Sequence, residues 1–349
     1  MDPRGVLRAV SARPRPRASL SVLPYRETGS GRLGLGARET GLALDAGLNS
    51  YLTRQFLPWR RDGDGILIAT ADLSAANLSW LQGTFGGARV VPIAAADLHK
   101  EIARQFRERL SHEAVTSLAT KMPELSAHRT ITPNQAVAFV AVAVAVAFVC
   151  CLWPSAIVQI LVAAMSAGFV VSATFRASLA LLGSRKEEVC APPSDESDLP
   201  VYTILVPLYR EAKIVPQLAQ ALLALDYPRD RLDVKLVVEE DDGETCAAAE
   251  ALKGQGPFEV LHVPACLPRT KPKACNYALR FARGDYLVVY DAEDRPEPDQ
   301  LRKSIDGFHT APPQTVCLQA RLAIYNGDDG WLARGIMAQT PLEWNRLAA

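Results

Sequence analysis

Acidic and basic side chains gather at the ends of apolar, β-branched segments after residue 200. Glu239-Glu240-Asp241-Asp242 follows one such segment, and Asp291-Ala292-Glu293-Asp294 follows another. Between them, Thr270-Lys271-Pro272-Lys273 supplies two lysines. Mg²⁺ and Mn²⁺ prefer hard oxygen ligands and often share their coordination with substrate phosphates, while lysine can neutralise the remaining phosphate charge. The pattern therefore predicts a site for a divalent metal and an anionic diphosphate.

The elements that must position these residues alternate in type. The β-rich runs are 201–207, 233–239, 258–263 and 286–290, and the helical patterns are 214–225, 245–253 and 274–282. Strands separated by helices of this length indicate an α/β fold with a mostly parallel, Rossmann-like sheet and helices on both faces. Ligands of such sheets bind at the carboxyl ends of the strands, where the acids lie.

Each signal also has a common structural explanation. An Asp-x-Glu after a strand is usually a solvated turn or a helix start, and Asp241-Asp242-Gly243 is an ordinary turn sequence. Paired lysines are usually surface charge, and Tyr209 after a strand is more often a partly buried aromatic. Their ordered occurrence on successive strand ends favours a shared binding site over four unrelated structural features.

The order of these motifs resembles the family 2 glycosyltransferases of GT-A fold, the group that contains cellulose synthase-like membrane enzymes, over about Val201 to Asn345. In particular, Asn276, Ala278 and Leu279 complete a Lys…Asn-x-Ala-Leu motif that begins at Lys271. The residues predicted to bind the nucleotide-sugar are Pro207, Tyr209, Glu211, Asp241, Asp242, Lys271, Lys273, Asn276 and Asp291.

The resemblance also implies a divalent metal, Mg²⁺ or Mn²⁺. Asp291 and Glu293 match the two acids of the family's Asp-x-Asp motif, and Asp294 adds a third acid, so the pair that binds the metal stays open. The implied activity is hexosyl transfer from a nucleotide-diphosphate sugar to a polysaccharide or lipid-linked acceptor, with inversion at the anomeric carbon.

Two motifs of the family have no match in the chain. One is the later acidic motif that supplies the catalytic base, and the other is the acceptor-binding Gln-x-x-Arg-Trp. Pro341–Asn345 resembles the amphipathic stretch that precedes them. We therefore expect the sequence to be C-terminally incomplete, with the base beyond Ala349.

Two alternatives belong to other classes. A sugar nucleotidyltransferase would need a Gly-rich phosphate loop after the first strand, and Leu208-Tyr209-Arg210-Glu211 contains no glycine. A non-catalytic nucleotide-sugar-binding or docking component of a polysaccharide export or secretion assembly stays open.

A run of 40 residues without a charged side chain, Ala136 to Phe175, precedes this region. As helix it would be about 60 Å long, enough for two crossings of a bilayer core of about 30 Å. Pro154 predicts a turn between helices at 136–153 and 156–176, within a membrane segment at 134–182. A soluble helix pair would need a polar face. Arg129 and Arg176 at the outer flanks predict a multi-pass protein of the cell inner membrane with both soluble domains cytoplasmic.

The remaining segments are a predicted disordered tail at 1–35, a small α/β domain at 36–130 and a linker at 183–200, ahead of the GT-A domain at 201–349. The small domain should hold helices at 41–56, 73–83 and 96–116 and strands at 65–70 and 88–93. It resembles the N-terminal domain of type II secretion ATPases, through this order and the stretch Asp62–Asp72. Some relatives bind cyclic di-GMP, for which only Arg32-Leu33-Gly34 matches here, so we favour docking of a polymer-export partner.

Composition excludes several classes. The 38 basic and 38 acidic residues balance, which argues against a nucleic-acid-binding surface. The seven cysteines form no CxxC pair, so we expect them to be reduced and predict no zinc site.

Overall fold

The computed structural model describes residues 21–22, 38–39, 41–43, 47–63, 65–182, 196 and 199–319. The chain divides into two units, Met1–Met122 with Asp198–Pro298, and Pro123–Ser197 with Asp299–Ala349. Arg32-Leu33-Gly34, Pro341–Asn345 and most of the predicted tail and linker lie outside the described residues.

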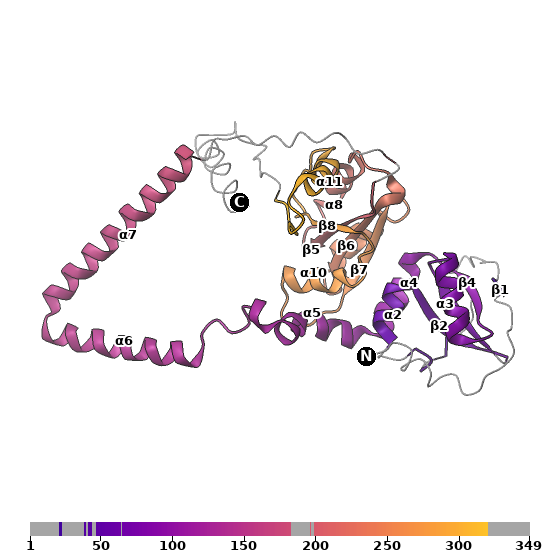
Figure 1. The fold of residues 1–349 in the computed structure, drawn as a ribbon, viewed down its shortest axis with the longest axis horizontal. Coiled ribbons are helices and arrows are strands. Elements are labelled where there is room, and N and C mark those ends of the chain that lie inside the picture. The colour runs from indigo at the N-terminus through magenta and orange to yellow at the C-terminus, as the bar shows by residue number, and fades with distance from the viewer. Residues whose placement is uncertain are drawn as a thin grey trace. The chain divides into compact units, whose positions relative to one another are not determined.

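The part of the first unit that begins at Asp198 contains a four-stranded parallel sheet. Its strands, labelled in Figure 1, are β5 (Tyr202–Leu208), β6 (Leu232–Glu239), β7 (Phe258–Val263) and β8 (Tyr286–Val289). They are hydrogen-bonded in the order β7-β6-β5-β8. The connecting helices are α8 (Val215–Leu223), α9 (Gly243–Glu250) and α10 (Lys271–Leu279). A short 3₁₀ turn, η5 (Arg229–Arg231), precedes β6. The predicted α/β fold with a parallel sheet flanked by helices is confirmed.

The strand order places a crevice above the middle of this sheet. The chain starts at β5, moves outward through β6 to β7, and then returns to β8 on the other side of β5. Right-handed crossovers put α8 and α9 on one face and α10 on the opposite face. The carboxyl ends of β5 and β8 therefore flank a topological switch point, where open α/β sheets bind ligands.

Strand β6 is buried along its whole length although it contains Asp233 and Lys235. Lys235 Nζ lies 2.9 Å from Asp233 Oδ1 and 2.5 Å from Glu259 Oε2 on β7. Arg283 donates to the same Asp233 oxygen at 2.8 and 2.9 Å. Each buried charge thus has an opposite charge at hydrogen-bond distance, which offsets the loss of hydration.

A second sheet lies in the N-terminal part of the same unit. Its strands are β1 (Ser21–Val22), β2 (Phe56–Asp62), β3 (Gly65–Thr70) and β4 (Arg89–Pro92), in the order β1-β4-β3-β2, with only β2–β3 antiparallel. The helices are α2 (Leu48–Thr53), α3 (Ala75–Phe85), α4 (Ala95–Gln105) and α5 (Arg107–Lys121). This is a small α/β arrangement, and its likeness to a secretion ATPase domain stays a prediction.

Two N-terminal elements differ from the sequence prediction. The helix expected at 41–56 is the shorter α2, because Gln55 takes a left-handed φ of 49° and Phe56 begins β2. Pro58 is tolerated there because β2 is an edge strand of the sheet. The single helix expected at 96–116 is interrupted at Phe106, a buried residue between α4 and α5.

Apolar packing continues from the N-terminal helices to the parallel sheet. Leu110 and Ala114 of α5 belong to the same buried cluster as Tyr277 in α10 and Phe281 just after that helix. Burial of this kind stabilises a fold in proportion to the apolar area removed from water. The two sheets of this unit therefore share a core.

The second unit contains two long apolar helices, α6 (Pro133–Leu152) and α7 (Pro154–Leu182). Candidate membrane spans are Pro133–Leu152 and Val158–Ser178, with mean hydropathies of 2.6 and 1.9 and no buried residues. Thr132 and Gln135 form a capping box at the start of α6, and the helix ends at its C-cap Trp153, just before Pro154 begins α7. The same unit holds η3 (Pro123–Leu125) and α11 (Gln300–Thr310). Length and composition thus agree with the predicted pair of spans.

Candidate functional site

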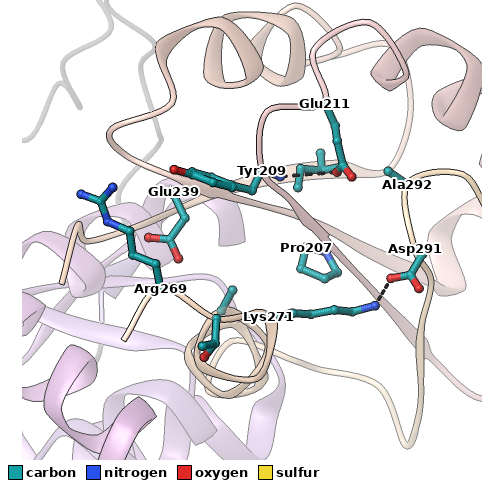
Figure 2. Close-up of a pocket in the computed structure, with 11 residues that line it drawn as sticks. Pro207, Tyr209, Glu211, Glu239, Arg269, Lys271, Asp291 and Ala292 are labelled. Carbon is teal, nitrogen blue, oxygen red and sulfur yellow. Dashed lines mark hydrogen bonds and ion pairs between the residues drawn. The ribbon is translucent and has the colours of Figure 1, made fainter. Parts of the chain in front are cut away.

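A cleft of about 190 Å³ lies at the predicted edge of the parallel sheet (Figure 2). It is formed by the ends of β5 and β6, the residues after β8 and the start of α10. Its lining residues are Pro207, Leu208, Tyr209, Glu211, Glu239, Arg269, Thr270, Lys271, Ala274, Asp291 and Ala292. Five of the nine residues predicted for the nucleotide-sugar, Pro207, Tyr209, Glu211, Lys271 and Asp291, are among them.

The turn after β5 is held by Asp242. Arg210 has a left-handed φ of 59°, and its backbone N–H donates to Asp242 Oδ2 at 2.5 Å. The other oxygen of Asp242 accepts from the Thr245 N–H at 3.3 Å and so caps α9. Burial opposes ionisation of Asp242, but these hydrogen bonds outweigh it, so its pKa lies below the ordinary value. Asp242 therefore supports the cleft wall and is not one of the lining residues.

Tyr209 and Glu211 flank that turn. The Tyr209 side chain is partly exposed, and the Arg210 guanidinium lies 5.1 Å from the centre of its ring. The Glu211 carboxylate accepts from the Tyr209 N–H at 3.4 Å. Burial, and then the charges of Glu293 and Asp242, raise the pKa of Glu211 above its ordinary value despite that hydrogen bond and Lys271. An aromatic ring next to the cleft can stack on a nucleotide base.

The two predicted lysines have different environments. Lys271, the first residue of α10, is half exposed and forms an ion pair with the Asp291 carboxylate across the cleft (Figure 2). Lys273 is buried, with its Nζ 2.9 Å from Glu239 Oε1 and donating at 3.0 Å to the Cys266 carbonyl. Lys271 is thus available to a phosphate, whereas Lys273 is committed to a buried ion pair.

Two charged lining residues were not among those predicted from the sequence, Glu239 and Arg269. Glu239 ends β6 and anchors Lys273, and Arg269 Nη1 lies 2.7 Å from Asp241 Oδ2. Asp241 therefore does not line the cleft but holds Arg269, which does. The signal for Arg269 was its place two residues before Lys271, in a loop rich in cations.

Asn276 faces helix α5. Its side-chain N–H donates to the Ala114 carbonyl at 3.0 Å, and it is not among the residues that line the cleft. The structure thus gives this motif residue a partner on another helix.

The three candidate metal ligands lie in one turn after β8. Asp294 Oδ2 accepts from the Asp291 N–H at 2.8 Å, and burial, then the charge of Glu293, raises the Asp294 pKa. Asp291 itself faces the cleft, and Glu293 is exposed. Among the described residues, no group of three or more His, Cys, Asp or Glu side chains is arranged to hold a metal. Mg²⁺-type ions are commonly held by one or two carboxylates plus substrate phosphates, and of the three candidates Asp291 is the one that lines the cleft.

Comparison with known proteins finds a family similarity in the same region. Residues 203–348 match the model of the family described as glycosyl transferase family 2. The beta-monoglucosyldiacylglycerol synthase of Synechocystis sp. is 31% identical over 172 residues, covering 48% of this chain and 35% of that protein. Cellulose synthase 2 of Novacetimonas hansenii is 30% identical over 137 residues, covering 39% of this chain and 8% of that protein.

Among solved structures, a mannosyltransferase from Pyrobaculum calidifontis in complex with GDP-Man and Mn²⁺ is 27% identical, covers 46% of each chain and has a TM-score of 0.36. The chain spans about a third or less of the length of the curated relatives named above. Residues 203–348 are therefore similar to glycosyl transferase family 2, which agrees with the glycosyltransferase prediction for this part of the chain.

Proposed function

We propose that the protein is a membrane-anchored glycosyltransferase that moves a hexose from a nucleoside diphosphate sugar to a polysaccharide or lipid-linked acceptor. The observation that carries the proposal is the cleft at the switch point of the parallel sheet, with Tyr209, Lys271 and Asp291 around it, inside the region that matches the family. Aromatic, cationic and acidic groups are the ones that a base, a diphosphate and its metal require.

In this proposal different residues of the cleft bind the different parts of the donor. Tyr209 lies against the base, and Lys271 leaves Asp291 to neutralise the diphosphate. Arg269, held by Asp241, contributes a second positive charge. Asp291, with Glu293 or Asp294, would hold the divalent metal. When bound, that ion stabilises the negative charge that develops on the departing nucleoside diphosphate.

Transfer with inversion also needs a general base for the acceptor hydroxyl. The resemblance assigns that base to none of the residues of the cleft.

We further propose that α6 and α7 cross the cell inner membrane as a hairpin, with the soluble parts on the cytoplasmic side. Their length, hydropathy and exposed apolar side chains support this, and Arg129 and Arg176 flank the run as the positive-inside rule requires. The names of the two relatives, a glycolipid synthase and a cellulose synthase, support a lipid or polysaccharide acceptor. For the N-terminal domain, docking of an export partner or binding of cyclic di-GMP stays a proposal.

The test is release of nucleoside diphosphate by membranes that contain the full natural protein, supplied with UDP-sugars or GDP-sugars and Mg²⁺ or Mn²⁺. We expect metal-dependent release of UDP or GDP that is lost in Asp291→Asn. The matched control is Glu297→Gln, an acid in the same loop that does not line the cleft. Metal-dependent binding without release in the full protein would instead favour the non-catalytic binding component. No binding and no release would refute the proposal.

A further inference from the structure

Helix α5 contacts two elements that carry residues of the cleft. One is α10, which begins with Lys271, and the other is the loop after β6, which contains Glu240 and Asp241. Both contacts lie outside the cleft itself, because neither α5 nor Glu240 lines it.

The contact with α10 joins one hydrogen bond to apolar packing. The Asn276 side chain donates to the Ala114 carbonyl of α5 at 3.0 Å. Leu110 and Tyr277 are each at most 1% exposed in the same cluster. Asn276 is five residues after Lys271, about 7.5 Å further along the helix axis. Since α10 is a single short helix, a shift of its α5-facing side also moves Lys271.

The contact with the loop is a bidentate ion pair between the Arg107 guanidinium and both oxygens of Glu240. Glu240 stands between two residues that act on the cleft. Glu239 lines it and holds Lys273, and Asp241 pairs with Arg269 at 2.7 Å. Arg107 therefore fixes the backbone from which both acids project.

A separate anchor limits how far α5 can move. His99, on the preceding helix α4, is fully buried, with Nδ1 2.7 Å from Glu259 Oε1 on β7 and Nε2 2.8 Å from Gln55 Oε1. Glu259 in turn pairs with Lys235. The α4–α5 segment is thus tied to the edge strand of the sheet independently of the cleft.

We propose that α5 is a positioning element of the donor cleft, with Arg107 on α5 and Asn276 on α10 as the positioning residues. Arg107 fixes the position of the acidic loop after β6, and Asn276 fixes the position of the helix that carries Lys271. The N-terminal segment thereby acts on nucleotide affinity without touching the nucleotide. The identity of the ligand rests on the function proposed above, whereas the positioning of α10 and of the loop after β6 by α5 does not.

The first experiment uses the full chain in nanodiscs and measures the affinity for UDP and GDP with Mn²⁺ by calorimetry. We expect Arg107→Glu to weaken nucleotide binding about tenfold, and the charge-swapped double variant Arg107→Glu with Glu240→Arg to recover most of that loss. The matched control is Arg104→Glu, which breaks an exposed ion pair with Glu101 on α4 and should leave the affinity unchanged. Unchanged affinity in Arg107→Glu, or a loss that the swap does not reverse, overturns the role of Arg107.

The second experiment needs no ligand. Hydrogen exchange of the α10 amides should be faster in Asn276→Asp, which replaces the donor by a carboxylate facing the Ala114 carbonyl. Unchanged exchange in α10 overturns the role of Asn276. If the wild-type protein binds neither UDP nor GDP, the proposed function fails, while this exchange measurement still decides whether α5 positions α10.

Discussion

The two lysines of α10 allow a direct separation of a structural role from a ligand-binding role. Lys273 is 3% exposed and forms a buried ion pair with Glu239, whereas the Lys271 side chain is 47% exposed. The perturbation is Lys→Met at each position, which keeps most of the apolar stem and removes the charge. We expect Lys273→Met to destabilise the protein and Lys271→Met to weaken nucleotide binding.

The magnitude follows from what each variant leaves behind. Lys273→Met leaves the Glu239 carboxylate without its cation and the Cys266 carbonyl without its donor. Removing one partner of a buried pair costs about 3–5 kcal/mol, and the lower end applies because Glu239 borders an open cleft. For a unit of roughly 150–250 residues, about 3 kcal/mol lowers the unfolding temperature by about 6–12 °C.

Lys271→Met removes only an exposed ion pair, so its unfolding temperature should lie close to that of the wild type. Loss of one charged contact to a phosphate costs about 1.5–3 kcal/mol, which corresponds to roughly tenfold or more in affinity. The assay is differential scanning fluorimetry of the full chain in nanodiscs, combined with titration of UDP and GDP. An unfolding temperature of Lys273→Met equal to that of the wild type, with affinity lost as in Lys271→Met, would show that Lys273 reaches the phosphate and would refute the reasoning.

Three further outcomes are expected. Asp242→Ala removes both the α9 cap and the acceptor of the Arg210 N–H, and should cost at least about 1–2 kcal/mol, measured by denaturant unfolding; no loss would contradict the assigned role. Burial opposes ionisation of Asp233 and Glu259, but neighbouring groups hold both pKa values below their ordinary values. At Asp233 these are the charges of Lys235 and Arg283. At Glu259 they are the His99 hydrogen bond and the Lys235 charge. Their stabilisation should therefore be complete above about pH 4.5 and be lost as the pH falls through the folded values, and unfolding followed from pH 7 to pH 3 would contradict this if it showed no acid loss. Val144→Arg in the middle of α6 should hinder membrane insertion by about 2.5–3.5 kcal/mol, and unchanged resistance to carbonate extraction would argue against a span there.

The parallel sheet could be predicted because its strands are buried and apolar. All eight residues of β6 are buried, and the predicted segments 258–263 and 65–70 coincide with β7 and β3. Strand β2 was missed for two reasons. Pro58 interrupts its pattern, and Gln55 adopts a left-handed backbone conformation that is uncommon for glutamine. The position at an edge, which makes that proline acceptable, depends on strand order and not on local sequence.

The site could be predicted in outline but not residue by residue. Spacing placed Lys271 and Asp291 at the same edge of the sheet, and the structure brings them together. Lys273 is two positions after Lys271 on a helix of 3.6 residues per turn, so its side chain points to nearly the opposite side. Asn276 is likewise directed to α5, a partner more than 150 residues earlier that no local pattern reveals.

The central claim is a metal-dependent nucleotide site centred on Asp291. Its most direct measurement is calorimetric titration of the full natural protein with UDP and with GDP, each with and without Mn²⁺, in wild type and in Asp291→Ala. We predict that one nucleotide binds only when Mn²⁺ is present and that Asp291→Ala abolishes this binding. A folded wild-type protein that binds neither nucleotide, or that binds equally well with Asp291→Ala, would contradict the account.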